Sequence, residues 1–247
     1  MAIKSILISQ PEPTNDRSPY FDLSGKYSLQ IDFRSFIEVV GVSLKEFRKQ
    51  KVNLLEHSAV ILTSKTAVDN YFRLAEEMRI NIPTSMKFFC ITETIALYLQ
   101  KYITYRKRKI FFGERKLEDM MEVLMKNRNE RFLLPVADVH KPTVANTLKK
   151  KKFSFTKAVM FKTVSSDLSD LRDVNYDILV FFSPSGINSL LENFPDFVQN
   201  STKIATFGPT TTEAVTQSGL RSDITAPTKE APSMSRAIEL FIKSEKN

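Results

Sequence analysis

The sequence predicts an α/β protein built on parallel sheets, and two observations carry that prediction. Short apolar runs of strand length alternate with amphipathic segments of helical period along almost the whole chain of 247 residues. The runs are continuously apolar, which is typical of strands covered by helices on both faces of a parallel sheet. In addition, one strand–loop–helix–strand–loop–helix block occurs twice, which indicates two similar domains rather than one continuous sheet.

The apolar runs locate the expected strands, and the amphipathic segments locate the expected helices. Strands are predicted at 4–9, 27–33, 59–63, 86–91, 108–112, 131–136, 157–163, 177–182, 203–207 and 222–226. Helices are predicted at 66–79, 94–103, 116–127 and 142–152, and helical patterns also follow directly after 183 and 208. Pro142 suits the first turn of its helix, because proline is favoured at that position.

The internal repeat is seen when two pairs of residues are aligned. Ser64 over Ser183 sets "AVILTSKTAVDNYF" against "ILVFFSPSGINSLL", and Thr92 over Gly208 sets "KFFCITETIALYL" against "KIATFGPTTTEAV". The two offsets differ by only three residues, so the order and spacing of the elements agree. Chance similarity between two strand–helix units is the alternative explanation.

Composition indicates a soluble globular protein, with 42% hydrophobic and 26% charged residues. No apolar run approaches the roughly 18 to 20 residues that span a bilayer. The start, "MAIKSILISQPEP", has too short an apolar core for a signal peptide and no small-residue cleavage site. The single cysteine, Cys90, excludes an internal disulfide and is expected to be a small buried hydrophobe. We therefore expect a cytoplasmic protein with no membrane association.

The net charge of +8 makes an anionic partner plausible without identifying one. Two blocks contribute much of the excess, "RKRK" at 106–109 and "KKKK" at 149–152. Such clusters are more often solvated faces than binding sites. They also lack the interleaved aromatic residues of a platform for single-stranded nucleic acid.

Four loops at the ends of predicted strands are rich in hydroxyl side chains. Ligands of open parallel sheets bind at these carboxyl ends, where loops lead into helices. Exposed backbone N–H groups and the helix dipole there attract carboxylates or phosphates. Helix capping alone would also explain serine and threonine at any one of these positions. The four loops are Thr63-Ser64-Lys65-Thr66, Thr92-Glu93-Thr94, Ser183-Pro184-Ser185-Gly186 and Gly208-Pro209-Thr210-Thr211-Thr212.

Other classes of site find little support in the sequence. It contains no G-x-G-x-x-G motif, no Walker loop, and only six glycines, which disfavours a dinucleotide or P-loop site. Its two histidines, His57 and His140, lack partners at metal-binding spacing. The segment "DVHKP" at 138–142 is either a polar cluster or, as we favour here, a surface loop.

The strand-end motifs resemble those of uroporphyrinogen-III synthases. "FFSPSGINSLL" is followed by "GPTTTEAVTQSGL" and "APTKEAPSMSRAIELF", which together are similar to the C-terminal half of that family. "ILISQPEP" resembles the family's first strand and loop, and "AVILTSKTAV" its first-repeat strand. The likeness covers most of the chain, and it is most specific between 177 and 240.

This resemblance implies two α/β domains joined by two connecting segments, with the active site in the cleft between them. One domain would combine residues 1–34 with 164–247. The other would comprise residues 37–161. The connections would lie at 34–37 and 161–164.

The resemblance also implies an activity, the cyclisation of hydroxymethylbilane. Its hydroxyl leaves as water and the last pyrrole ring is inverted, which gives uroporphyrinogen III. The implied partner is therefore a linear tetrapyrrole polycarboxylate, which suits a basic protein with hydroxyl-rich helix N-termini. Holding this flexible chain curled is mainly proximity catalysis. No cofactor, metal or nucleic acid is implied, and a monomer is expected.

By position, the resemblance implies two sets of substrate-binding residues. The set in one domain is Thr63, Ser64 and Lys65, together with Thr92, Glu93 and Thr94. The facing set is Ser183, Pro184, Ser185, Gly208, Pro209, Thr210 and Thr211.

Two positions depart from the family pattern. Family members often have glycine where Thr92 stands, so the backbone there is expected to differ. Many also have a tyrosine, proposed to assist hydroxyl departure, where this chain has Phe161. A phenyl ring cannot donate a proton, so the catalytic acid is not identified, and Phe161 is equally well read as core packing.

Two alternatives to the synthase remain open. A two-domain binding module could keep the tetrapyrrole site without the chemistry, and it would form a stable complex with no ring closure. A basic nucleic-acid-binding protein would instead bind any DNA or RNA with a steep dependence on salt.

Overall fold

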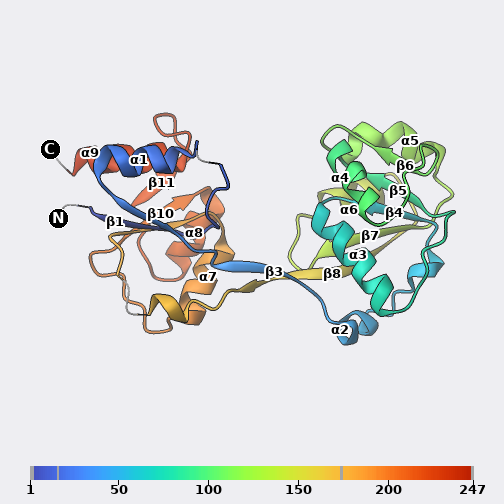
Figure 1. The fold of residues 1–247 in the computed structure, drawn as a ribbon, viewed down its shortest axis with the longest axis horizontal. Coiled ribbons are helices and arrows are strands. Elements are labelled where there is room, and N and C mark those ends of the chain that lie inside the picture. The colour runs from blue at the N-terminus through green and yellow to red at the C-terminus, as the bar shows by residue number, and fades with distance from the viewer. Residues whose placement is uncertain (1–2, 16, 173–174, 246–247) are drawn as a thin grey trace. The chain divides into compact units, whose positions relative to one another are not determined.

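The computed structural model describes residues 3–15, 17–172 and 175–245. The chain forms two compact units (Figure 1). Unit 1 combines the residues up to Glu38 with those from Val164 onward, and unit 2 comprises Val39–Thr163. The predicted α/β class is confirmed, since each unit has a parallel sheet flanked by helices.

The sheet of unit 1 places the first strand of the chain close to its centre. Within the described residues it has five strands in the order β11-β10-β9-β1-β2, and each neighbouring pair is parallel. The bounds are β1 Ser5–Ile8, β2 Gln30–Phe33, β9 Ile178–Phe181, β10 Lys203–Phe207 and β11 Ile224–Ala226. Strand β1 therefore pairs with β9, which lies far away in the sequence.

The sheet that contains the strands of unit 2 has the order β3-β8-β7-β4-β5-β6 among the described residues. The pairs from β8 through to β6 are parallel. The bounds are β3 Ile37–Gly41, β4 Ala59–Leu62, β5 Lys87–Cys90, β6 Ile110–Phe112, β7 Phe132–Ala137 and β8 Phe155–Ser165. The long β8 and the edge strand β3 form the two chain segments that run between the units.

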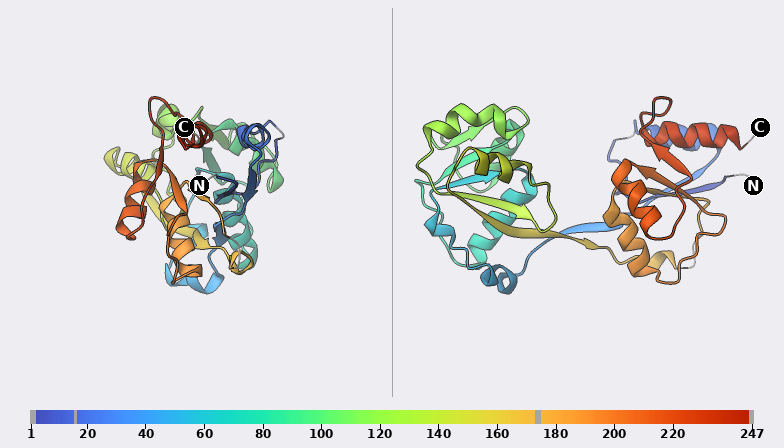
Figure 2. Two further views of the ribbon diagram at one scale, coloured as in Figure 1. Left: turned by 90° about the vertical axis from the view of Figure 1, so that its left-hand side faces the viewer. Right: turned by 180° about the vertical axis from the view of Figure 1, so that it is seen from behind.

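Helices cover both faces of each sheet, as the continuously apolar strands predict. In unit 1, α1 (Pro19–Tyr27) and α9 (Met234–Ser244) lie together on one face, and α7 (Pro184–Asn193) and α8 (Pro209–Gln217) pack on the other (Figures 1 and 2). Unit 2 is covered by α2 (Leu44–Lys49), α3 (Lys65–Glu77), α4 (Glu93–Tyr98), α5 (Met121–Lys126) and α6 (Thr143–Lys150). No described helix is both long and apolar enough to traverse a bilayer.

The side chains of β1 show why the apolar runs are unbroken. Ile6 and Ile8 enter the core beneath α1 and α9, while Leu7 enters the core beneath α7. Successive side chains of a strand point to opposite faces, so a strand covered on both sides must be apolar at every position. The strands β4 and β5 obey the same rule in unit 2.

Several predicted elements differ in their limits. The strand predicted at 27–33 begins only at Gln30, because Tyr27 ends α1 and Ser28 adopts a left-handed backbone with φ 53°. The helix predicted at 116–127 begins as a 3₁₀ turn before α5. Helices α1, α2 and α9 and strand β3 were not predicted. Helix α2 is only six residues long, although its capping box at Ser43 and Glu46 is visible in the sequence.

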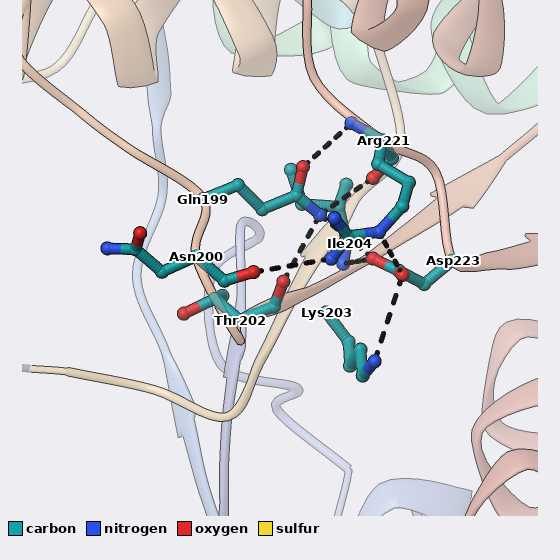
Figure 3. A network of polar contacts seen from close by, with 7 residues as sticks. All are labelled: Gln199, Asn200, Thr202, Lys203, Ile204, Arg221 and Asp223. Carbon is teal, nitrogen blue, oxygen red and sulfur yellow. Dashed lines mark hydrogen bonds and ion pairs between the residues drawn. The ribbon is translucent and has the colours of Figure 1, made fainter.

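A buried carboxylate fastens the edge of the unit 1 sheet where β10 and β11 begin (Figure 3). Asp223 accepts hydrogen bonds from the backbone N–H of Ile204 at 2.9 Å and from the Arg221 guanidinium at 2.6 Å. Gln199 donates to Asp223 at 2.8 Å and accepts from the backbone of Arg221 at 2.7 Å. These bonds lock the amino ends of the strands and leave the opposite edge to the hydroxyl-rich loops.

Candidate functional site

In unit 2, two of the predicted loops lie side by side at the carboxyl edge of the sheet. Strands β4 and β5 are parallel neighbours, with Leu62 opposite Cys90. Ser64 then caps α3, and Thr92 caps α4. Their hydroxyl oxygens each accept a hydrogen bond from the backbone N–H three residues on, at 3.0 and 3.3 Å. Both residues are therefore N-caps, as their residue types predict.

The equivalent loops of unit 1 have the same arrangement. Strands β9 and β10 are parallel neighbours, with Phe181 opposite Thr206. Ser183 caps α7, and its hydroxyl accepts from the backbone N–H of Gly186 at 3.3 Å. Gly208 occupies the cap position of α8. We call these four segments, around Ser64, Thr92, Ser183 and Gly208, the strand-end loops.

The strand-end loops present backbone N–H groups that have no protein acceptor among the described residues. In unit 2 these are the N–H groups of Lys65 and Thr66 and those of Glu93 and Thr94. An α-helix leaves its first N–H groups without intrahelical partners, and they carry the positive end of the helix dipole. A carboxylate can accept hydrogen bonds at such a position.

In unit 1, proline limits the number of these donors. Pro184 and Pro209 occupy the first position of α7 and α8 and have no N–H. Ser185 and Thr210 follow them, and their N–H groups find no acceptor within the described parts of the chain. Each of these two helices thus offers one unpaired backbone donor.

Gly208 has a backbone conformation that other residues rarely adopt. Its φ is +88° and its ψ 151°, in a region that is essentially reserved for glycine. Its N–H donates to the carbonyl of Ala226 at 2.6 Å, which ties the loop to the end of β11. The glycine therefore sets the direction in which α8 begins.

Thr211 is the predicted site residue that the structure removes from the surface. It is only 1% exposed, and its N–H donates to the carbonyl of Gly208 at 3.2 Å. A direct contact between this side chain and a ligand is therefore not available here. Burial follows from its place on the first turn of α8, facing the sheet.

Lys65 is the predicted site residue with a free cationic group. Its ammonium lies 5.2 Å from the centre of the Tyr98 ring, a cation–π contact that leaves the charge at the surface. The Tyr98 hydroxyl donates to Asp69 at 2.9 Å, which fixes the ring. Lys65 makes no ion pair with any described residue, so its charge is not neutralised by the protein.

Unit 2 also contains a cavity of about 350 Å³, which is lined both by residues predicted to bind substrate and by residues without such a prediction. Thr63 and Ser64 line one part of it, and Phe161 of β8 lines another. His140 and Lys141, from the loop between β7 and α6, line it as well. The sequence favoured a surface loop for this segment. That is correct for Val139, which is 82% exposed, but His140 is half-buried against the cavity.

A β-bulge brings Phe161 to this position. The register between β7 and β8 runs regularly as far as Val136 and Val159, and then pairs Ala137 with Phe161, so Met160 has no partner on β7. Bulges redirect a strand and its side chains, and they are common beside functional sites. Phe161 is half-buried, and it lies on the strand next to the one that leads into the His140 loop.

Cys90 is buried in β5, as predicted, and burial raises the pKa of its thiol to about 12. A thiol in this environment stays protonated and unreactive at neutral pH. Within the described ranges, no three side chains of the metal-binding types gather into a cluster.

Comparison with known proteins identifies the family. The family model of uroporphyrinogen-III synthase HemD matches residues 23–236. No curated protein matches the chain. Among solved structures, the uroporphyrinogen-III synthetase of Helicobacter pylori 26695 is 18% identical, with a TM-score of 0.58, over 98% of this chain and 100% of the other.

A mutant uroporphyrinogen III synthase from the extremely thermophilic bacterium Thermus thermophilus is 12% identical, with a TM-score of 0.47, over 98% of this chain and 99% of the other. The Helicobacter likeness supports the two-unit α/β fold. The family match covers most of the sequence, including all four strand-end loops. The chain therefore belongs to the uroporphyrinogen-III synthase family, the cyclising hydro-lyases of tetrapyrrole biosynthesis.

Proposed function

We propose that the strand-end loops hold hydroxymethylbilane while this synthase closes it into uroporphyrinogen III. The observation that carries the proposal is the repeated set of helix N-termini, two in each unit, with N–H groups that no described residue engages. The substrate bears an acetate and a propionate on every pyrrole ring. Carboxylates are the ligands that such N-termini favour.

The proposed binding residues follow from these positions. The backbone donors are the N–H groups at the starts of the four helices that no described residue engages, and the Lys65 ammonium adds a charge. The remaining residues of the loops hold these donors in place, and Pro184 and Pro209 contribute no N–H. The proposed binding residues are Thr63, Ser64, Lys65, Thr92, Glu93, Thr94, Ser183, Pro184, Ser185, Gly208, Pro209 and Thr210. Thr211 contributes by packing, because its side chain is buried. A net charge of +8 adds a general attraction for a polycarboxylate.

The chemistry requires positioning and proton transfer rather than an added reagent. The hydroxyl of hydroxymethylbilane leaves as water, and every atom of the macrocycle comes from the substrate. Holding the two ends of the linear molecule together replaces a search over many conformations, and such positioning lowers barriers substantially. The residues of the loops therefore act by fixing which pyrrole carbon attacks.

We also propose two domains, 1–34 plus 164–247 and 37–161, and a cytoplasmic monomer. The division of the chain into two compact units supports the first part. A single buried cysteine suits a reducing compartment. Size-exclusion chromatography with light scattering would test the monomer, and a dimer mass would contradict it.

The activity is tested by a coupled assay with freshly generated hydroxymethylbilane. The products are oxidised and separated by isomer, because uncatalysed closure gives type I. Type III as the main isomer is expected. Type I alone, at the enzyme-free rate, would refute catalysis by this chain. A stable complex with the bilane under those conditions would then favour a binding module.

A further inference from the structure

We infer that His140 is a catalytic residue of this synthase, donating the proton that the departing hydroxyl needs. The inference rests on the proposed function, because it assigns a residue to the same reaction. It is carried by the cavity in unit 2, where His140 is brought together with Thr63, Ser64 and Phe161.

The orientation of the imidazole is fixed by one hydrogen bond. Nδ1 of His140 lies 2.7 Å from the carbonyl oxygen of Ala137. A carbonyl oxygen can only accept, so Nδ1 must carry a proton. Nε2 is therefore the nitrogen that remains for a ligand. Fixing one imidazole nitrogen in order to direct the other is a recurring feature of acid–base histidines.

The other side chains of the cavity are poorer proton donors. Phe161 has no exchangeable proton, and the remaining surface is largely apolar, supplied by β7 and α6. The Ser64 hydroxyl caps α3 through its oxygen and keeps its proton, but a neutral alcohol is a much weaker acid than an imidazolium. Lys141 is exposed, and it makes no ion pair among the residues described. An ammonium on a flexible stem is better suited to attract a substrate carboxylate than to transfer a proton at a fixed point.

The backbone explains why these groups meet. The bulge at Ala137 and Phe161 lies immediately before the His140 loop and redirects the end of β8 beside it. Thr63 and Ser64 enter from β4, which pairs with β7 on its other side. Apolar walls around a few convergent polar groups are typical of a small-molecule site.

The proposed step conserves atoms and charge. The bond between the hydroxymethyl carbon and oxygen breaks, and both electrons leave with oxygen. That oxygen takes the proton from Nε2 and departs as water. The bilane becomes a cation stabilised by the lone pair of its pyrrole nitrogen. After ring closure, neutral Nε2 accepts the proton released from the attacking pyrrole, which restores the imidazolium.

Two substitutions at one position separate proton transfer from hydrogen bonding. His140→Asn places an amide where Nδ1 lies, so it can keep the bond to Ala137 but has no group at Nε2. His140→Gln can reach the Nε2 position with an amide that hydrogen-bonds but cannot transfer a proton. General acid catalysis contributes about 10²- to 10⁴-fold. We expect both variants to lose at least about 10²-fold in kcat with little change in KM.

His57→Gln is the matched control. His57 is the other histidine of the chain, lies in the same unit, and also holds its Nδ1 near a backbone carbonyl, that of Asn53, at 2.9 Å. It is absent from the cavity lining and should retain wild-type kcat. Added imidazole should partly restore the kcat of His140→Ala, because free imidazole can occupy the space that the His140 side chain leaves. Thermal melts of all variants report on folding.

The outcomes are distinguishable. Low kcat in both His140 variants, with folding intact and imidazole rescue, supports the inference. Wild-type kcat in both variants overturns it, while the synthase assignment stands. Wild-type kcat in His140→Gln alone also overturns it, because hydrogen bonding would then suffice. Absence of type III product from the wild-type protein would instead refute the proposed function itself.

Discussion

The strand-end loops of the two units occupy equivalent positions in the repeat but present different chemistry. In unit 1 both helices begin with proline, and the backbone at Gly208 has a φ of +88°. In unit 2 the equivalent of Gly208 is Thr92, with an extended φ of −139°, and α3 begins with the cationic Lys65. Thr92 and Gly208 therefore begin their helices from different backbone conformations.

The difference indicates a division of tasks. The loops of unit 1 offer a ligand backbone donors and a close approach, with no cation among Ser183–Gly186 or Gly208–Thr212. Unit 2 adds Lys65 and a cavity with an imidazole. We therefore expect backbone changes to be most damaging in unit 1, and side-chain changes to matter more in unit 2.

The largest effect is expected from Gly208→Ala. No atom lies within 4 Å of a Cβ added there, so the cost is backbone strain, about 1–3 kcal/mol in unfolding free energy. Redirecting the start of α8 should also lower the rate of type III formation by about 10²-fold. Urea unfolding and the isomer assay measure the two effects.

Gly219→Ala is the matched control, because this residue also has a positive φ, +73°, with open space around it. It lies beyond the C-terminal end of α8. Similar destabilisation with normal activity is expected. Equal activity losses at both glycines would mean that the effect comes from stability, not from the site.

An intermediate effect is expected from Lys65→Met. Removing one exposed charge near a carboxylate should raise KM by about two- to five-fold, because exposed ion pairs contribute roughly 0.2–1 kcal/mol. The increase should shrink at high salt. Lys126→Met, on α5 and paired with Glu122, is the control and should leave KM unchanged. An unchanged KM for Lys65→Met would contradict a contribution of the Lys65 charge to substrate binding.

The smallest effect on turnover is expected from alanine at the serine caps. Ser64→Ala and Ser183→Ala should each lower the unfolding free energy by about 1 kcal/mol. Their rates should stay within roughly two-fold, since water can replace the hydroxyl. Thr210→Ala should behave likewise.

Ser43→Ala removes a cap of the same kind from α2, outside the strand-end loops, and controls for stability. Severe rate losses in Ser64→Ala and Thr210→Ala, equal to that of Gly208→Ala and with folding intact, would contradict binding through the backbone.

Local sequence patterns predict the parts of the fold that depend on local rules. Continuous apolar runs locate the central strands, such as β4 and β9, and serine after such a run marks a cap, as at Ser64 and Ser183. Strand β3 was not predicted, because it lies at a sheet edge, most of its residues are exposed, and Glu38 interrupts its apolar run.

The catalytic assignment of His140 could not be predicted, because it depends on pairing between distant segments. Phe161 and His140 meet Thr63 only because β7 lies between β4 and β8 in the sheet. The burial of Thr211 has a similar origin, since which face of α8 meets the sheet is set by packing. The available signal for His140 was its segment, 138–142, which follows a predicted strand as the four loops do.

The order of strands in unit 1 has a consequence for synthesis on the ribosome. Strand β1 is made first, but its partner β9 begins only at Ile178. At roughly 5–20 residues per second, β1 waits on the order of ten to thirty seconds for that partner. Unit 2 is continuous in sequence, so it can complete its fold during this interval. An exposed strand edge invites wrong pairing, which makes the nascent unit 1 the part of the chain most dependent on chaperones.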